Sequence, residues 1–75
     1  MNAKQVLDTK GLACPLPIVR TKKAMDAFSS GEVLEIHVTD KGAASDIPAW
    51  AKTNGHQILK QVEEDGVLKF WVQKA

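Results

Sequence analysis

Residues 33–39 read VLEIHVT, and the alternation in this stretch decides the fold class. Aliphatic residues at every second position point to one side of an extended chain, and the polar residues point to the other. Such a strand has one face on a core and one on solvent, which predicts a sheet covered by helices on a single face. The expected core residues of this strand are Leu34, Ile36 and Val38.

The segments before this strand predict another strand and a helix. Residues 5–9 (QVLDT) form the short strand, and residues 15–29 carry apolar residues at helical spacing until Gly31 stops the pattern. A strand, a crossover helix and a second strand predict two strands that pair in parallel. The apolar stripe of the helix is expected to comprise Pro17, Ile18, Thr21, Ala24, Met25 and Phe28.

The segment after the alternating strand predicts a second helix, over about residues 43–54. Pro48 lies inside this pattern and lacks the backbone N–H that a helix interior needs. We therefore expect either a helix that starts near Asp46, with Pro48 in its first turn, or an irregular turn before the helix.

The last part of the chain predicts a β-hairpin. Residues 56–63 and 67–73 form its strands, and Glu64-Asp65-Gly66 supplies the turn. Trp71 points away from the core face, where it either packs against neighbouring strands or contacts a partner. The full order is β-α-β-α-β-β. We therefore predict an α/β fold, a two-layer sandwich with a four-stranded mixed sheet and two helices on one face.

Length and composition limit the function classes. The 75 residues are expected to form a single domain (1–75), too small for a deep enclosed pocket. Ten Lys and Arg against nine Asp and Glu give a net charge of +1, which does not predict direct nucleic-acid binding. The sequence has neither a long apolar run nor a signal-peptide pattern, so we expect a cytoplasmic location and no membrane insertion.

The stretch Gly11-Leu-Ala-Cys-Pro-Leu-Pro17 contains the single cysteine of the chain, Cys14. Pro15 suits the first position of a helix, and Pro17 still falls within the first turn. This places Cys14 at or next to the N-cap, where the helix dipole is expected to lower the pKa of the thiol. The alternative, that Cys14 is a small buried hydrophobic residue, stays open at this point.

The sequence resembles the TusA/SirA-like sulfur-carrier family from about residue 5 to the C-terminus. The resemblance rests on Gly11-Leu12-x-Cys14-Pro15-x-Pro17, Lys23-Ala24-Met25, Gly31-Glu32-x-Leu34, Thr39-Asp40, Asp46-Ile47-Pro48-x-Trp50 and Gly55-His56. It implies the same β-α-β-α-β-β sandwich. It also implies that Cys14 accepts sulfane sulfur as a persulfide, with Gly11, Pro15 and Pro17 shaping its turn.

The resemblance implies partners rather than a cofactor. The expected partners are a sulfur-donor protein (a cysteine desulfurase or a rhodanese), a downstream sulfur acceptor and, in some routes, a thiosulfate permease. Family members serve tRNA thiolation, molybdenum-cofactor synthesis, sulfur oxidation or thiosulfate uptake, and the shared motif does not separate these routes. Such a sulfurtransferase-like carrier acts with partner enzymes and need not be an enzyme in isolation.

The first predicted helix offers a candidate docking surface beside Cys14. Leu16 and Val19 lie off the core stripe, and three basic residues surround them. They are either scattered surface residues or the apolar centre of a patch with a basic rim. The predicted partner-binding residues are Leu16, Val19, Arg20, Lys22 and Lys23.

The remaining polar residues favour structural roles. Asp40 and Asp46 form either an acid pair or, as we expect, the charge and turn chemistry of a helix start. His37 and His56 have no Cys or carboxylate at a familiar ligand spacing, so no metal site is predicted. A role for His56 as the base for Cys14 stays open, because the sequence supplies no distance.

Two functions from different classes follow. The first is a sulfur-relay protein that accepts sulfur on Cys14 and transfers it to a partner. The alternative is a non-catalytic regulatory or adaptor domain, in which Cys14 is inert and the helix face with Leu16, Val19, Arg20 and Lys23 binds a partner. Reactivity of Cys14 separates the two.

Overall fold

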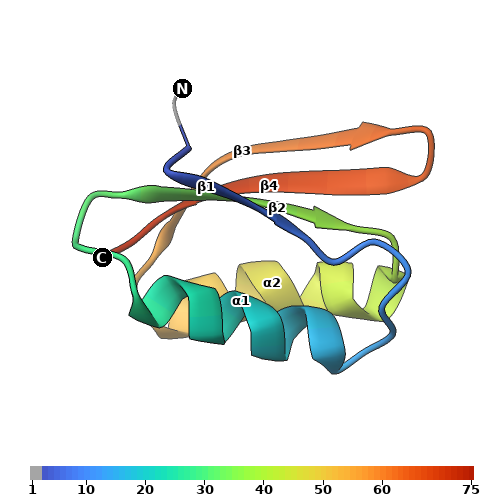
Figure 1. The fold of residues 1–75 in the computed structure, drawn as a ribbon, viewed down its shortest axis with the longest axis horizontal. Coiled ribbons are helices and arrows are strands. Elements are labelled where there is room, and N and C mark those ends of the chain that lie inside the picture. Colours follow the sequence, from blue (N-terminus) through green and yellow to red (C-terminus); the bar gives the residue numbers. More distant parts are fainter. Residues whose placement is uncertain (1–2) are drawn as a thin grey trace.

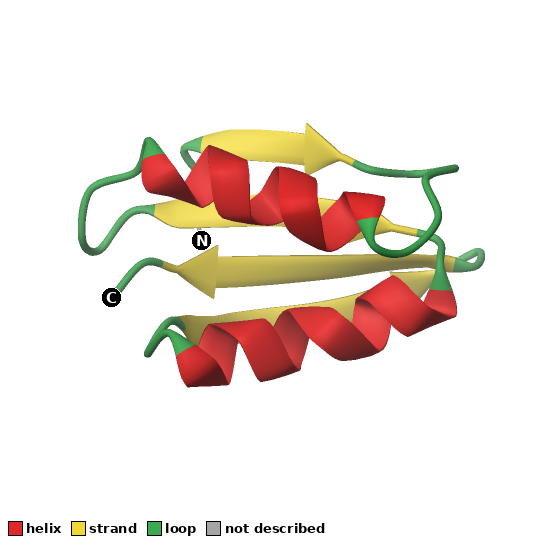
Figure 2. Ribbon diagram, turned by 90° about the horizontal axis from the view of Figure 1, so that it is seen from below, coloured by secondary structure: helices red, strands yellow, loops and turns green. Residues whose placement is uncertain are grey.

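The computed structural model describes residues 3–75, which form one four-stranded sheet and two helices. The strands lie in the order β1-β2-β4-β3. β1 pairs with β2 in parallel, and β4 pairs antiparallel with both β2 and β3. Both helices cover the same face of the sheet (Figures 1 and 2). The predicted two-layer α/β sandwich is confirmed. In chain order the elements are β1 (Gln5–Asp8), α1 (Leu16–Asp26), β2 (Val33–Val38), α2 (Lys41–Thr53), β3 (Gln57–Glu64) and β4 (Val67–Gln73).

The core lies between the sheet and the helices, as the alternation in residues 33–39 predicts. Every second residue of β2 is fully buried, and β4 buries Phe70 and Val72 beside them. The stripe predicted for α1 also faces this core, although Ala24 is only partly buried. Burying such side chains contributes about 1.5–3 kcal/mol each. The remaining buried apolar residues of the core are Ile18, Met25, Phe28, Ala43, Ala44, Ile47, Trp50 and Ala51.

Helix α1 is shorter at both ends than the predicted residues 15–29. Pro15 is the N-cap and not the first helical residue. At the other end the chain tightens, because the N–H of Ala27 donates to the carbonyl of Ala24, three residues back, at 3.2 Å. Such a turn ends an α-helix, so the helix stops before Ser29.

Helix α2 begins at Lys41, earlier than either predicted alternative. The carboxylate of Asp40 accepts a hydrogen bond from the N–H of Ala43 at 2.9 Å and caps the helix. Pro48 therefore lies in the helix interior, where it removes the bond that would reach the carbonyl of Ala44. The prediction of a start near Asp46 was wrong, because the Asp40 cap and the buried face of α2 outweigh one lost bond.

We expect Asp40→Ala to destabilise the protein by about 1 kcal/mol, because the substitution removes the N-cap of α2. Urea unfolding followed by far-ultraviolet circular dichroism measures the change. Asp26→Ala is the matched control, since this exposed acid lies at the C-terminal end of α1, where a negative charge is unfavourable. Equal losses in the two variants would contradict the capping role.

The hairpin has the predicted turn, with positive φ at both central residues, Asp65 (50°) and Gly66 (78°). β3 occupies Gln57–Glu64, one residue later than predicted, and a bulge between Ile58 and Lys60 interrupts its register with β4. On the face of the sheet away from the helices, the Lys60 ammonium lies 5.5 Å from the centre of the Trp71 ring. Trp71 therefore packs against a neighbouring strand.

Candidate functional site around Cys14

Cys14 lies in the loop between β1 and α1, and its side chain is exposed. The buried-residue alternative is therefore wrong. Hydrogen bonds tie the loop to the end of β2: the Thr9 hydroxyl donates to the carbonyl of His37 at 2.6 Å, and the N–H of Gly11 donates to Thr39 Oγ1 at 3.0 Å. Gly11 has a φ of +82°, which residues with a side chain rarely adopt. Its role in shaping the turn around Cys14 stays a prediction.

The start of α1 offers Cys14 few free N–H groups. Pro15 and Pro17 have none, and the N–H of Leu16 donates to the carbonyl of Ala13 at 2.9 Å. The positive end of a helix consists of such free N–H groups, so most of the expected attraction for a thiolate is missing here.

The N-terminal half of α2 lies against Cys14. The thiol of Cys14 donates a hydrogen bond to Asp46 Oδ2, with an S···O distance of 3.4 Å. A Cβ atom on Gly42 would lie 3.9 Å from the Cys14 Cβ and 3.3 Å from a carboxylate oxygen of Asp40. Cys14, Asp40 and Asp46 thus form one cluster, called the Cys14 site below. Both helices begin at this end of the sheet (Figure 1).

The two carboxylates reverse the expected effect on Cys14. The hydrogen bond to Asp46 raises the pKa of the Cys14 thiol, followed by desolvation and the negative charges of Asp46 and Asp40. The sequence-based prediction of a lowered pKa was wrong. It relied on the dipole of α1 and did not include the acids that α2 brings to the same place.

Comparison with known proteins places this chain in a family. The family model described as sulfurtransferase TusA matches residues 5–74. The chain belongs to the TusA family. It is 60% identical over 74 residues to a putative sulfur carrier protein, YrkI, of Bacillus subtilis, covering 99% of both chains. It is 45% identical over 71 residues to the sulfur carrier protein TusA of Allochromatium vinosum, covering 95% of this chain and 93% of that one.

The fold of this TusA-family chain is also similar to a solved structure. The crystal structure of a SirA-like protein from Desulfitobacterium hafniense superposes with a TM-score of 0.81 at 27% sequence identity, covering 92% of this chain and 95% of that one. The predicted TusA/SirA-like resemblance is therefore confirmed.

In this TusA-family chain, four of the five predicted docking residues form one stripe along α1, called the docking stripe below. They are Leu16, Val19, Arg20 and Lys23, at the helical spacing of three and four residues. Leu16 is 46% exposed and Val19 is 51% exposed. Val19, Arg20 and Lys23 line a hollow of about 510 Å³ against Leu7 of β1.

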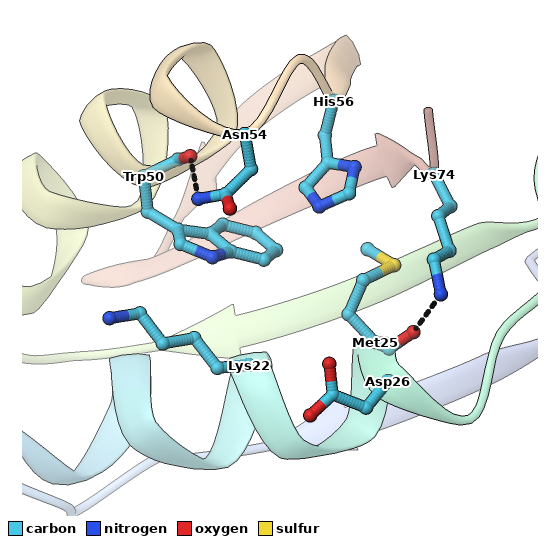
Figure 3. Close-up of a pocket in the computed structure, with 7 residues that line it drawn as sticks. All are labelled: Lys22, Met25, Asp26, Trp50, Asn54, His56 and Lys74. Carbon is cyan, nitrogen blue, oxygen red and sulfur yellow. Dashed lines mark hydrogen bonds between the residues drawn. The ribbon is translucent and has the colours of Figure 1, made fainter.

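The fifth residue, Lys22, lies apart from the docking stripe. It lines a second hollow, of about 430 Å³, between the C-terminal halves of the two helices (Figure 3). Trp50 and His56 lie on the opposite wall of that hollow, and the Lys74 ammonium there donates to the carbonyl of Met25 at 3.1 Å. Lys22 therefore does not share one patch with the other four predicted docking residues.

His56 is not positioned as a base for Cys14. It follows the C-terminal end of α2, at the opposite end of the helices from the Cys14 site (Figure 1). Its Nδ1 accepts a hydrogen bond from the N–H of Ala75 at 3.0 Å, and its ring packs 5.0 Å from that of Trp50. Burial, then the charge of Lys74, lowers the pKa of His56.

No three His, Cys, Asp or Glu side chains of residues 3–75 gather in a way that would hold a metal ion. His37 contacts Glu35 on the open face of the sheet.

Neither helix in this part of the chain is long and apolar enough to cross a membrane.

Sequence reasoning missed the contact between Cys14 and Asp46. Asp40 behaves as predicted, as the cap of α2, whereas Asp46 lies farther along the helix and faces Cys14. Cys14 and Asp46 are 32 positions apart, so neither local spacing nor periodicity relates them. One signal in the sequence could have predicted the contact. Asp40 and Asp46 both lie near the start of the second helix, and this fold places the starts of both helices at the same end of the sheet, beside Cys14.

Proposed function

We propose that this protein is a sulfur carrier in which Cys14 accepts sulfane sulfur as a persulfide and passes it to a partner protein. The observation that carries the proposal is the exposure of Cys14, the single cysteine of the chain, on a loop braced by β2. The sulfur-carrier names of the TusA-family relatives support the same role.

The transfer needs one nucleophile and no cofactor. The Cys14 thiol loses its proton, and the thiolate attacks the outer sulfur of a donor persulfide. A new S–S bond forms on Cys14, the S–S bond of the donor breaks, and the donor cysteine leaves as a thiolate that takes up a proton. Cys14 is oxidised to the persulfide level and the donor cysteine is reduced to a thiol, so the electrons balance. A thiolate or substrate of the acceptor attacks the loaded persulfide in the same manner.

Such a carrier needs a donor and an acceptor that recognise its surface. We propose a cysteine desulfurase or a rhodanese as the donor class, and the docking stripe as the contact surface. Val19 supplies exposed apolar area there, and Arg20 and Lys23 supply positive charge without a carboxylate partner among the ion pairs of residues 3–75. Pro15 is the N-cap of α1 and Pro17 lies in its first turn, so Cys14 directly precedes the helix that carries the stripe.

Mass spectrometry of the intact protein tests the proposal. Incubation with a cysteine desulfurase and cysteine, or with a rhodanese and thiosulfate, is expected to add the mass of one sulfur atom, which a reducing agent then removes. Loading by neither donor class would favour the adaptor function, in which the stripe binds a partner and Cys14 is inert.

Charge reversal tests the docking stripe. The measured quantity is the rate of association with a donor protein that loads Cys14. Arg20→Glu with Lys23→Glu is expected to lower this rate by about tenfold or more at low salt, and to flatten its salt dependence. Stopped-flow or surface-plasmon measurements give these rates. Lys52→Glu with Lys60→Glu is the matched control, since both are exposed lysines outside the stripe. Equal slowing by both pairs would place the contact elsewhere.

A further inference from the structure

We propose that Asp46, assisted by Asp40, holds Cys14 as a thiol in the free protein and selects a partner that brings a positively charged group to the Cys14 site. The inference rests on the proposed function, because it assigns a regulator to the same cysteine. In this view the sulfur donor pairs a Lys or Arg side chain with Asp46 as it docks, and that pairing releases the thiolate.

The geometry carries the first part of the proposal. Asp46 Oδ2 lies 3.4 Å from the Cys14 Sγ, so the S–H group has an acceptor that favours the protonated form. Asp46 is exposed and is held by α2, and no ion pair of residues 3–75 engages it. Its carboxylate is therefore available both to the thiol and to an incoming cation.

The charged groups that shift the pKa of Cys14 are both acids, although Lys41 follows Asp40 directly at the start of α2. Asp40 contributes a second carboxylate from the start of α2, and both acids act to raise the pKa of Cys14. On the loop side, Lys10 lies 4.0 Å from Asp8, and the N–H groups at the start of α1 are mostly absent or occupied. The two acids of its own chain therefore disfavour a thiolate in this place.

A positively charged side chain of a docked partner would favour the Cys14 thiolate. A Lys or Arg side chain against Asp46 competes for the carboxylate, and a positive charge near sulfur favours the thiolate. The free carrier then reacts more slowly with stray electrophiles than it does once a donor has docked. The docking stripe is basic, whereas the Cys14 site is acidic, so a matching donor is acidic where it meets α1 and basic beside its own persulfide.

The first test is the pH dependence of Cys14 alkylation by iodoacetamide in the free protein. Asp46→Asn is expected to move the profile to lower pH and to raise the rate near neutral pH by about threefold or more. The gain in rate is smaller than the gain in thiolate, because a less basic thiolate is a weaker nucleophile. Asp40→Asn, which keeps a good N-cap, is expected to shift the profile less. Asp26→Asn, far from the site on α1, is expected to leave it unchanged.

The second test uses charged thiol reagents, which need no protein partner. After normalisation to free cysteine, the trimethylammonium-ethyl methanethiosulfonate is expected to react with wild type about threefold or more faster than the sulfonatoethyl reagent. Asp46→Asn is expected to remove much of this preference. An alkylation profile unchanged in Asp46→Asn, or a reagent preference equal in the variant and wild type, would overturn the proposal. Neither measurement depends on sulfur loading, so failure here is distinct from failure of the carrier function.

Discussion

Replacing Cys14 with serine is expected to abolish sulfur loading completely, whichever donor is used. The hydroxyl oxygen cannot form a persulfide, and the chain has no second cysteine to accept the sulfur. Cys14 is exposed and makes one side-chain hydrogen bond, to Asp46, which a serine hydroxyl can also donate. The variant should therefore remain folded. Intact mass after incubation with donor and sulfur source, together with a urea unfolding curve, gives both results.

The matched control is Ala13→Ser, which places the same side chain at the neighbouring exposed position and retains Cys14. It is expected to load like wild type. Persistent loading of Cys14→Ser would mean that the added sulfur is not carried on this residue and would contradict the proposed function. Loss of loading in Ala13→Ser as well would point to damage of the loop rather than loss of the nucleophile.

Replacing Phe70 with alanine is expected to cost about 3–5 kcal/mol of unfolding free energy, the range for large aromatic residues removed from a packed core. Phe70 is fully buried on β4, an inner strand, and pairs with Ile36 of β2 and Gln61 of β3. A domain of this size has a total stability of roughly 4–11 kcal/mol, so the loss is a large fraction of it. Urea unfolding followed through the fluorescence of the tryptophans measures the loss.

Val6→Ala is the control for this experiment, because Val6 is 53% exposed on the edge strand β1. Its expected cost is about 0.5 kcal/mol or less. A loss of similar size in both variants would mean that the sheet is not organised around the buried face of β4. An unchanged slope against urea would show that the difference lies in stability and not in the compactness of the unfolded state.

The buried faces of the elements were predicted from the sequence, whereas the start of α2 was not. Alternation in residues 33–39 and the helical spacing from Pro17 to Phe28 predicted the buried faces, because each depends on neighbours within one element. The start of α2 was predicted too late, since Pro48 is locally unfavourable in a helix interior. The buried Ala43, Ala44 and Ile47, which the tertiary fold packs against the sheet, offset that local cost.

By itself the sequence determined the order of elements, the core face of β2, the hairpin turn and the place of the single cysteine directly before Pro15. All of these depend on local periodicity, backbone preference and composition. Only the tertiary structure showed that Cys14 is exposed. It also showed that the pKa of the thiol is raised, because Asp46 reaches it from another helix, 32 residues along the chain. It likewise separated Lys22 from the docking stripe and carried His56 to the far end of the fold. Electrostatic effects depend on distance in space, and distances between elements arise only when the helices and the sheet pack together.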